Sequence, residues 1–562
     1  MKKLLKNKDL ILGLILILAF SLIFLCLSRA DIQHDDATYS FRSLGYFDYM
    51  DSNVQTSPIS WFDEIPWWGK LSFHDHPPLV FAVQFLFFNL FGNSLFTARL
   101  PFALLGIATI YIFYLLIKKL FKNEDIALLS AFVLAVSSYH AWISRIGYLE
   151  IFVIFFSVLT FYLFLEALQN HKKFLLFGVS LGLAALTKYT SIFILPVVIV
   201  YLLIKNKKLL LNKYFIFSLI IAFLIFSPVV LYNIMMYKTR GHFDLQIAGL
   251  LGQDMSDWPV IGSRGTQGSY LSTFLNIFKN LFKVYSLPFF ILILISSIYF
   301  LFRFLKNKKN QSYLFIFLVL LFAILEIIFI GSNFRFISII NPFLAAIVGY
   351  SIFKFSFLAK GNFNKILVVL LVMVFVCEIF YNINTNILFK PKGNKNIFYS
   401  ESRVENNGFN QLEDYFISNH NFGRKPKNKL NSFKDFEVNI GSDINGGDVF
   451  VYDPTLNWFS SLWYLRRWGI YYKEFVISAA DLSNFIPASD WVDTFRENGV
   501  KNMYYIRGKE FSLFDSSVNK EENKTSSRNL AIIFRALGAS LEHIYNYNNE
   551  IAFEIYKLKI NN

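Results

Sequence analysis

Two neighbouring carboxylates, Asp35 and Asp36, are the first residues of the sequence whose type and spacing suit chemistry. They lie with Asp31 in the run 29–39, directly after an apolar segment. Paired acids of this kind act as a general base or hold a divalent cation. The alternative interpretation is a solvated polar edge that keeps the apolar segment from sliding in a membrane.

A second polar run, 73–79, has two histidines on either side of Asp75, followed by two prolines. Proline restricts the preceding residue to an extended backbone and suits the first turn of a helix, so we expect His76 to be held rigidly where a helix begins. Two histidines in one extended segment are not a complete zinc site. A purely structural turn is the alternative.

Further charged residues lie at the ends of apolar segments. An ionisable group at the edge of a membrane costs free energy, so each of these residues is a candidate for a functional site. Each also has a simpler explanation, such as mutual pairing of the arginines and the glutamate, or a lysine that reaches towards the interface. These residues are Arg99 in T-A-R-L-P, Arg145 and Glu150 in S-R-I-G-Y-L-E, Lys188 in L-T-K-Y-T and Arg335 in S-N-F-R-F.

The elements that must position these residues are membrane helices. Of 562 residues, 55% are hydrophobic and 19% aromatic, and the mean hydropathy of +0.44 is too high for an ordinary soluble domain. Windows of about 20 nearly uncharged residues predict an α-helical polytopic membrane protein. The expected spans number about eleven: 10–28, 98–117, 126–143, 148–168, 174–187, 189–204, 214–235, 280–302, 313–331, 335–353 and 366–385.

The placement of lysine and arginine predicts the orientation. Clusters of lysines fall in alternate connections, whereas the short connections on the other side contribute Arg145, Lys188 and Arg335. Because cations are retained on the cytoplasmic side, the N-terminus is expected in the cytoplasm of a plasma membrane, and the net charge of +15 needs no nucleic acid partner. The lysine, asparagine, isoleucine and phenylalanine bias suggests a prokaryotic source.

This topology places the loops 29–97 and 236–279 and the C-terminal tail outside. The apolar run 79–91 is too short to span and is expected as an interfacial helix. In the second loop, Asp244, Asp254, Asp257 and Arg264 are candidates for closing over a site. The first apolar segment has a signal-peptide alternative, since small residues flank Arg29.

The tail differs from the rest in composition. The division expected is a transmembrane domain over 1–385 and a soluble extracytoplasmic α/β domain over 386–562. Residues 390–445 lack clear periodicity. Beyond them, the pattern predicts strands at 448–452, 502–506, 541–547 and 551–558, with helices at 456–468, 492–498 and 529–539. The tryptophans at 458, 463 and 468 suit either sugar stacking or a core.

The sequence also indicates which kinds of site and substrate to expect. Cys26 and Cys377 lie in apolar windows, so a disulfide framework is not expected. There is no glycine-rich nucleotide loop. Because the topology brings acids and cations to one face of the membrane, the composition suits a phosphoryl-linked substrate, with cations on the phosphate and a carboxylate to remove a proton.

The order of these motifs resembles a known family. An acidic pair after the first span, H-P-P-L, R-L-P-x-A-L, R-x-G-Y-L-[DE] and L-A-x-L-T-K are similar to the polyprenyl-phosphate-sugar glycosyltransferases of the GT-C fold. That group includes protein O-mannosyltransferases and lipid A aminoarabinose transferases. The resemblance covers roughly residues 10–350.

The resemblance implies a role for each motif. Asp35 or Asp36 would be the catalytic base. Substrate and donor-phosphate binding would fall to Asp75, His76, Arg99, Arg145, Glu150, Lys188 and Arg335. No fixed cofactor is implied, and a divalent cation (Mg, Mn or Zn) held by Asp36 and Glu150 stays open, because the family more often has Glu and Asp at these two positions.

The function expected is therefore an inverting glycosyltransferase. It would move a sugar from a polyprenyl-phosphate-linked donor to a hydroxyl of a glycan, lipid or protein at the outer interface of the bilayer. Two alternatives are a membrane carrier or lipid flippase, for which two matching halves are expected, and an inactive glycan-binding scaffold.

Overall fold

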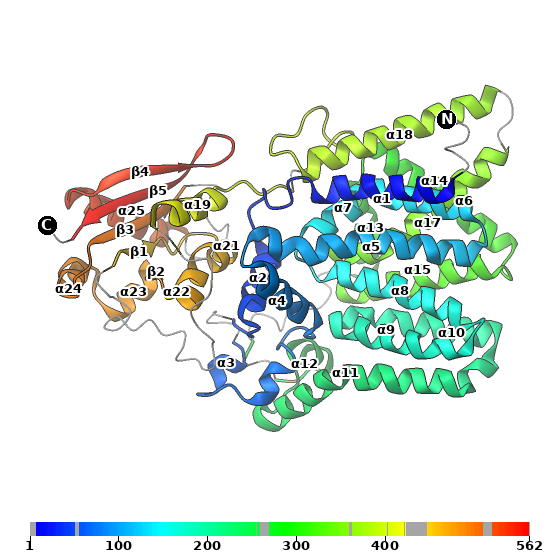
Figure 1. The fold of residues 1–562 in the computed structure, drawn as a ribbon, viewed down its shortest axis with the longest axis horizontal. Helices are drawn as coiled ribbons and strands as arrows, with labels where there is room; N and C mark the ends of the chain where they lie inside the picture. Colours follow the sequence, from blue (N-terminus) through cyan, green and yellow to red (C-terminus); the bar gives the residue numbers. More distant parts are fainter. Residues whose placement is uncertain are drawn as a thin grey trace.

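The computed structural model describes residues 7–50, 56–254, 256–258, 269–358, 362–401, 403–420, 422, 447–509 and 520–560. A bundle of helices forms one part of the molecule and a small sheet with its own helices forms the other (Figure 1). The arrangement confirms the expected fold class, a polytopic helical protein with a C-terminal α/β region.

Each of the eleven predicted spans contains at least one helix. The described part of the chain has seven helices long and apolar enough to cross a membrane, or eight with the bent pair α6 and α7, so a count of eleven is not established. The long ones are α5 (Leu95–Phe121), α8 (Glu150–Ala167), α11 (Lys213–Arg240), α14 (Leu287–Lys306), α15 (Gln311–Ile330), the run Phe334–Ser356 that includes α16 (Phe334–Ile337) and most of α17 (Asn341–Leu358), and α18 (Asn362–Asn386).

Four predicted spans, besides the one over 280–302, are shorter or interrupted. α1 (Lys8–Phe24) has 17 residues and α9 (Phe174–Thr187) has 14. A short 3₁₀ segment, Tyr189–Phe193, leads into α10 (Ile194–Lys205). α6 (Glu124–Val136) and α7 (Ser138–Arg145) meet at an angle of 60°.

The span expected over 280–302 is interrupted, and the boundary expected there was wrong. An amphipathic helix, α13 (Tyr270–Val284), ends first, and α14 begins at Leu287. Ser286 has an extended backbone and Pro288 lies in the first turn of α14, where proline costs no hydrogen bond. The chain therefore changes direction at Tyr285 and Ser286.

Glycines set the closest helix contacts in the bundle. Gly178 and Gly182 are four residues apart on α9, and a Cβ on either would collide with the backbone of α11, at Ser218 for Gly178 and at Ala222 for Gly182. Small residues at this spacing let two membrane helices approach closely. α9 is thereby held against α11, which fixes the position of the turn that carries Lys188.

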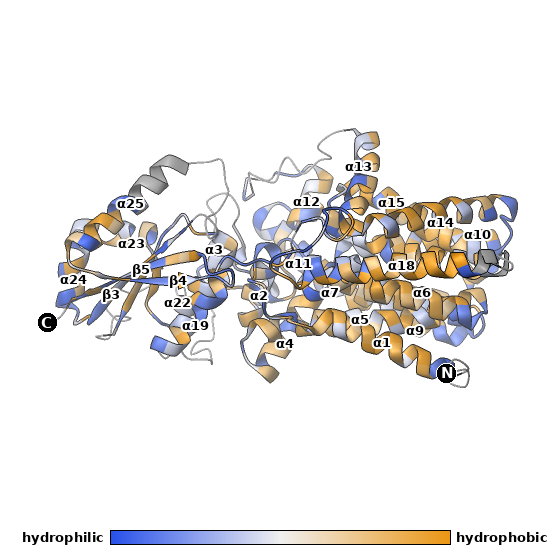
Figure 2. Cartoon of the chain, turned by 90° about the horizontal axis from the view of Figure 1, so that it is seen from above, coloured by the Kyte–Doolittle hydropathy of each residue, from blue (hydrophilic) through white to orange (hydrophobic). Residues whose placement is uncertain are grey.

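The lysine-rich connections gather at the end of the bundle remote from the sheet. Lys8 pairs with Asp125, Lys118 with Glu124, and Lys173 with Glu166. Figure 2 shows this polar end beyond a wide apolar band. The predicted clustering of lysines on one side therefore corresponds to one end of the fold.

Short helices cover the opposite end of the bundle, next to the sheet. They are α2 (His34–Gly45), α3 (Pro58–Trp61), α4 (Leu79–Phe91) and α12 (Leu245–Leu251). α4 is the 13-residue helix expected for the apolar run, and its Leu86, Leu90 and Phe91 are exposed.

The sheet is mixed and has five strands in the order β2-β1-β3-β5-β4 among the described residues. β2 (Val476–Ser478), β1 (Val449–Tyr452) and β3 (Asn502–Gly508) are parallel, whereas β5 (Ile551–Lys559) is antiparallel to β3 and to β4 (Ser540–Tyr545). The helices of this region are α19 (Phe409–His420), α21 (Trp458–Ser461), a π-helical turn (Leu462–Arg466), α22 (Arg467–Tyr472), α23 (Ala479–Phe485), α24 (Trp491–Glu497) and α25 (Lys520–Ala536).

The four predicted strands are confirmed, whereas β2, α19 and α23 were not predicted. β2 has three residues, too few for a periodic signal. α19 lies in the stretch 390–445, where the lack of clear periodicity gave no signal for a helix. Trp463, Tyr464 and Trp468 are buried and form core, whereas Trp458 is partly buried.

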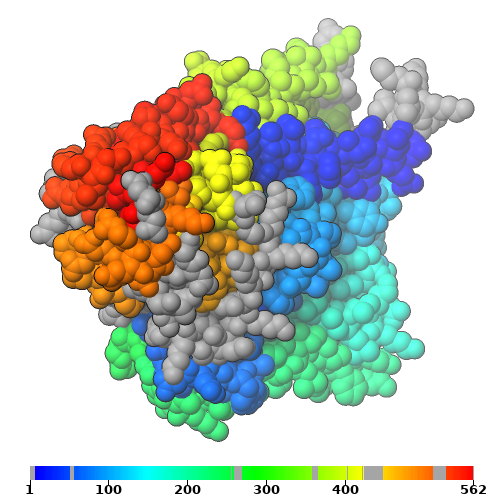
Figure 3. Space-filling model, turned by 60° about the vertical axis from the view of Figure 1, so that its left-hand side comes forward, coloured from blue at the N-terminus to red at the C-terminus, as the bar shows by residue number. Residues whose placement is uncertain are grey.

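The loop after α1 joins the helical bundle to this region. The Asp31 carboxylate accepts hydrogen bonds from the backbone N–H groups of Asn407 and Asn410 at 2.6 and 2.9 Å, at the start of α19. The Ile32 N–H donates to the Tyr464 hydroxyl at 3.1 Å. In Figure 3, α19 (yellow) lies between the red C-terminal strands and the blue N-terminal helix. Asp31 thus caps a helix of the C-terminal region, which removes it from the candidate bases.

Asp31 should give the protein a pH-dependent stability. Burial raises the pKa of Asp31 from 3.8 to about 6, although the backbone N–H groups at the start of α19 oppose the shift. An acid whose pKa is higher in the folded state stabilises that state fully below its unfolded pKa, and this contribution is lost as the pH rises through the folded pKa. We expect the Tm in detergent to fall between about pH 4 and pH 7, and to fall less in Asp31→Asn, which cannot titrate. Equal pH dependence in the two proteins would contradict this assignment.

Candidate active site

Asp35 is the partly exposed carboxylate of the acidic pair. It lies in the first turn of α2, where the helix dipole favours an anion. The backbone of the preceding residue, His34, is left-handed with φ of 52°, which turns the chain sharply into the helix. The side chain of Asp35 is 29% exposed and forms an ion pair with Arg335. Asp35 is therefore accessible and faces a cation from the far end of the sequence.

Asp36 lies in a different environment from its neighbour. It is buried, and its Oδ2 accepts a hydrogen bond from Nε of Arg99 at 3.1 Å. Burial raises the pKa of Asp36, while Arg99 opposes the shift. A Cβ at Gly147 would collide with the Asp36 carboxylate, which explains the glycine in the R-x-G-Y-L-E motif. Asp36 is thus locked between α5 and the turn before α8.

Arg99 and Arg145 hold the end of α1. Besides Asp36, Arg99 contacts the carbonyl oxygens of Leu27 and Ala30 at 3.1 and 2.9 Å. Arg145 donates to the carbonyl oxygen of Ile23 at 2.7 Å and to those of Leu22 and Cys26 at 3.2 Å. The last carbonyls of a helix lack intrahelical partners, and cations stabilise them. Both arginines therefore have structural partners in this structure, and Arg145 does not pair with Glu150.

Glu150, Lys188 and Arg335 form a connected group with Asp35. Nζ of Lys188 lies 2.6 Å from Oε1 of Glu150, and Nε of Arg335 lies 4.0 Å from the same oxygen. Both cations also lie over the ring of Phe336, at 4.6 and 4.9 Å from its centroid. The result is a row of alternating charge, Asp35, Arg335, Glu150 and Lys188, supplied by α2, α16, α8 and the turn after α9. We call these four residues the charge row.

Asp75 and His76 are next to the charge row, since the Tyr39 hydroxyl contacts both His76 and Asp35. Asp75 accepts a hydrogen bond from Arg42 at 2.8 Å and lies 3.2 Å from Nδ1 of His76. Burial alone would raise the pKa of Asp75, but Arg42 and the two histidines hold it well below its usual value. Burial lowers the pKa of His76, although Asp75 opposes this shift. The pair is therefore an ionised carboxylate beside a neutral imidazole at neutral pH.

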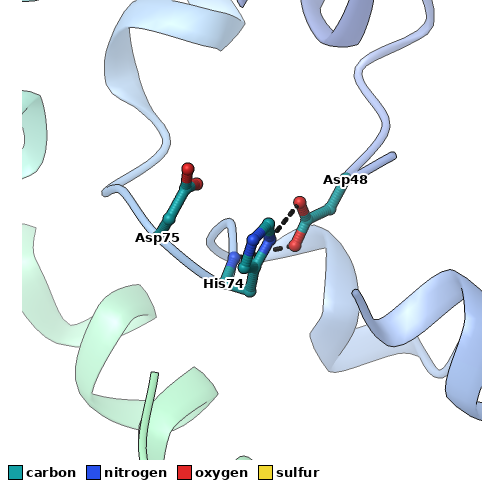
Figure 4. Close-up of side chains that lie close together, drawn as sticks. All are labelled: Asp48, His74 and Asp75. Atoms are coloured by element: carbon teal, nitrogen blue, oxygen red, sulfur yellow. Dashed lines mark hydrogen bonds and ion pairs between the residues drawn. The ribbon is translucent and has the colours of Figure 1, made fainter. Parts of the chain in front are cut away.

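The described residues offer one cluster with the spacing of metal ligands, Asp48, His74 and Asp75, whose ligand atoms lie within 4.8 Å of one another (Figure 4). Asp48 already bonds to both the backbone N–H and Nδ1 of His74 at 2.7 Å, and Asp75 pairs with the buried guanidinium of Arg42. A second cation beside Arg42 would be repelled in this buried site. The residues do not fit a metal centre. Asp36 and Glu150, the expected ligands, pair with different cations.

The loop expected over 236–279 contacts the site region through Asp244. This buried carboxylate bonds to the hydroxyl of Tyr189, the residue after Lys188, and caps α12. The N–H of Leu245 donates to the carbonyl oxygen of His74 at 2.8 Å. Asp257 pairs with Arg240 and Asp254 forms a local turn. Arg264 lies outside the described residues.

Three relevant residues were missed by the sequence interpretation. Tyr39 joins Asp35 to His76, and Arg42 is the partner of Asp75. Glu326 lies within α15, and its Oε2 is buried without a hydrogen-bond partner in the described part of the chain. A carboxylate in an otherwise apolar span was a visible signal for Glu326. Tyr39 and Arg42 gave no such signal, because their partners come from another segment.

Comparisons with known proteins agree with this architecture. Residues 75–232 match the family described as dolichyl-phosphate-mannose-protein mannosyltransferase. An uncharacterized protein of Aquifex aeolicus (strain VF5) is 31% identical over 166 residues, which are 29% of this chain and 33% of that protein. YkcB of Bacillus subtilis (strain 168), a mannosyltransferase by name, is 27% identical over 161 residues, 28% of this chain and 22% of that protein. The chain thus spans about a third or less of these two relatives.

The solved structure of ArnT from Cupriavidus metallidurans bound to undecaprenyl phosphate is similar over nearly the whole chain. The TM-score is 0.53 at 12% sequence identity, covering 98% of this chain and 97% of ArnT. At this identity the likeness establishes the fold. The chain is a membrane protein with the GT-C fold, which confirms the fold that the motif order indicated.

Gly147→Ala should disturb the site through Asp36. The added Cβ meets the Asp36 carboxylate, so we expect a loss of about 1–3 kcal/mol of stability, seen as a lower Tm in detergent. Gly447→Ala is the control, because among the described residues no heavy atom beyond its chain neighbours lies within 4 Å of its Cβ position. Neither glycine has a left-handed backbone, so the pair tests space alone. Equal Tm values for the two variants would contradict the packing of Gly147 on Asp36.

Proposed function

We propose that the protein is an inverting glycosyltransferase that moves a sugar from a polyprenyl-phosphate-linked donor to an acceptor hydroxyl. The observation that carries this proposal is the charge row, in which two cations and two carboxylates from four separate elements meet at one end of the bundle, and one of the carboxylates, Asp35, is accessible. Such a set suits a substrate with a phosphate next to the reacting carbon.

Lys188 and Arg335 are the proposed ligands of the donor phosphate. In the free protein they neutralise Glu150 and Asp35. A phosphate that enters beside them adds an acceptor for both cations, which loosens Arg335 from Asp35. The Asp35 carboxylate then becomes available to an acceptor hydroxyl, so donor binding prepares the base.

The reaction proposed is a single displacement. The acceptor oxygen forms a bond to the anomeric carbon, while the bond from that carbon to the phosphate oxygen breaks. The phosphodiester leaves as a phosphomonoester with one more negative charge, which Lys188 and Arg335 stabilise. Asp35 takes the proton of the acceptor hydroxyl. One displacement inverts the configuration at the anomeric carbon.

Asp35 is the better base of the acidic pair. Its side chain is 29% exposed, whereas that of Asp36 is 2% exposed and is bound to Arg99. A base must come within hydrogen-bond distance of the proton that it removes. Asp36 is proposed to hold Arg99 and Gly147 in place, and no step of the mechanism uses a metal.

The site is proposed to lie at the outer interface of a prokaryotic plasma membrane. The lysine-rich end of the bundle would face the cytoplasm, and the charge row and the sheet would lie on the other side. Nucleotide sugars are absent there, so a sugar must arrive on a carrier that crosses the bilayer. A polyprenyl phosphate is such a carrier, and the solved ArnT structure holds undecaprenyl phosphate.

The proposal predicts different effects for the two neighbouring acids. Asp35→Asn should lower kcat by about 10²–10⁴-fold while donor binding persists, because it removes the base and leaves the cations. Asp36→Asn should mainly lower the Tm. Transfer from a panel of radiolabelled undecaprenyl-phosphate sugars to native membranes measures activity, and Asp125→Asn, at the lysine-rich end, is the control.

Two results would contradict the proposal. One is full transfer activity in Asp35→Asn. The other is a folded wild-type protein that binds undecaprenyl phosphate yet transfers none of the sugars, which would favour a carrier or a scaffold.

A further inference from the structure

A row of hydrogen bonds leads from Asp35 into the protein interior. Tyr39 lies one helical turn after Asp35, and its hydroxyl is 3.3 Å from Oδ2 of Asp35 and 3.3 Å from Nε2 of His76. The other ring nitrogen of His76 lies 3.2 Å from Asp75, which is paired with Arg42. One hydroxyl therefore links the acidic pair after the first helix to the His-Asp-His run.

The direction of these hydrogen bonds depends on where one proton lies. Nδ1 of His76 lies 3.2 Å from the Asp75 carboxylate without hydrogen-bond geometry, and the negative charge of Asp75 favours the tautomer with the proton on Nδ1, which leaves Nε2 as an acceptor. A phenolic hydroxyl has one proton to donate, so Tyr39 donates either to Asp35 or to His76. If Asp35 is protonated, it can donate to the Tyr39 oxygen while Tyr39 donates to His76.

We propose that Tyr39 relays the proton taken up by Asp35 to Nε2 of His76. This inference rests on the proposed function, in which Asp35 removes the proton of the acceptor hydroxyl. Asp35 gives its proton to the Tyr39 oxygen as Tyr39 gives its own proton to His76. The carboxylate and the phenol are restored, and one imidazolium is formed. No electrons move between groups, and the count of protons is unchanged.

The surroundings of His76 make it a temporary acceptor. Asp75 stabilises the imidazolium, whereas burial, Lys188 and Arg42 oppose it. The ring is therefore neutral before the reaction and gains a proton when Asp35 passes one to it through Tyr39. Once donor binding has drawn Arg335 away from Asp35, the Tyr39 hydroxyl remains as a hydrogen-bond donor that favours the ionised carboxylate. At the other end of the relay, Asp75 stabilises the imidazolium against the cost of burial.

The relay also gives the proton on Asp35 a path away from the carboxylate when substrates are bound. A bound donor and acceptor would cover the exposed edge of Asp35, so the proton could not pass directly to water. Tyr39 is buried on the other side of this carboxylate, and its ring packs edge-on against Phe81 at 5.6 Å. The phenol is thereby held in line between Asp35 and His76.

Tyr39→Phe tests the relay, because it removes the hydroxyl and keeps the ring. We expect kcat for transfer from undecaprenyl-phosphate-linked sugar to fall about 10- to 100-fold, with undecaprenyl phosphate binding within about twofold of wild type. The acidic limb of the kcat profile should move to higher pH, because the ionised Asp35 loses a hydrogen-bond donor. The solvent deuterium isotope effect on kcat should also change. His76→Gln should lower kcat and change the isotope effect in the same way but leave the acidic limb in place, because Tyr39 still donates to Asp35.

Tyr46→Phe is the matched control, since Tyr46 caps the same helix and packs against Phe73. It should keep the wild-type rate, pH profile and isotope effect. A Tyr39→Phe protein with wild-type kcat would overturn the relay and leave the proposed function intact. A lower kcat with an unchanged pH profile and isotope effect would also overturn it, because packing alone would then explain the loss. If wild type and Tyr46→Phe both bind undecaprenyl phosphate and transfer nothing, the proposed function fails and the relay fails with it.

Discussion

A charge buried in a protein interior must be paired, because the cost of removing an ion from water otherwise exceeds what folding can supply. This constraint organises the end of the bundle next to the sheet. Asp36 pairs with Arg99, Asp75 with Arg42, and Glu150 with Lys188. In each pair the partners come from different segments of the chain. Pairing the charges therefore also fixes how the short helices sit on the long ones.

The same pairs divide the charged residues into a rigid frame and an accessible row. Arg99 and Arg145 donate hydrogen bonds to backbone carbonyls of α1 and the loop after it, so they fix the position of this part of the chain beside the site. Arg335 and Lys188 contact carboxylates and an aromatic ring instead. Lys188 and Arg335 can accept a phosphate as a further partner, whereas the N–H groups of Arg99 and Arg145 are already used by backbone carbonyls. This difference in partners separates residues that build the site from residues suited to bind a substrate.

Much of the architecture was predictable from the sequence, because membrane spans are long apolar runs and sheet strands follow a local pattern. The motif order indicated the GT-C class, which the ArnT likeness confirms. The roles of single charges were less predictable. Arg145 and Glu150 are five residues apart, yet one contacts α1 and the other Lys188. Their partners depend on how distant helices pack, and no spacing in the sequence records that. Which residues carry catalysis stays a prediction.

The central claim is that the phosphate of the donor binds between Lys188 and Arg335 and draws Arg335 away from Asp35. A cryo-EM structure of the protein with bound undecaprenyl phosphate tests it most directly. The account predicts phosphate density within hydrogen-bond distance of both cations, with the Arg335–Asp35 ion pair opened. Phosphate density at the lysine-rich end of the bundle, or an Arg335–Asp35 pair unchanged by the ligand, would contradict it.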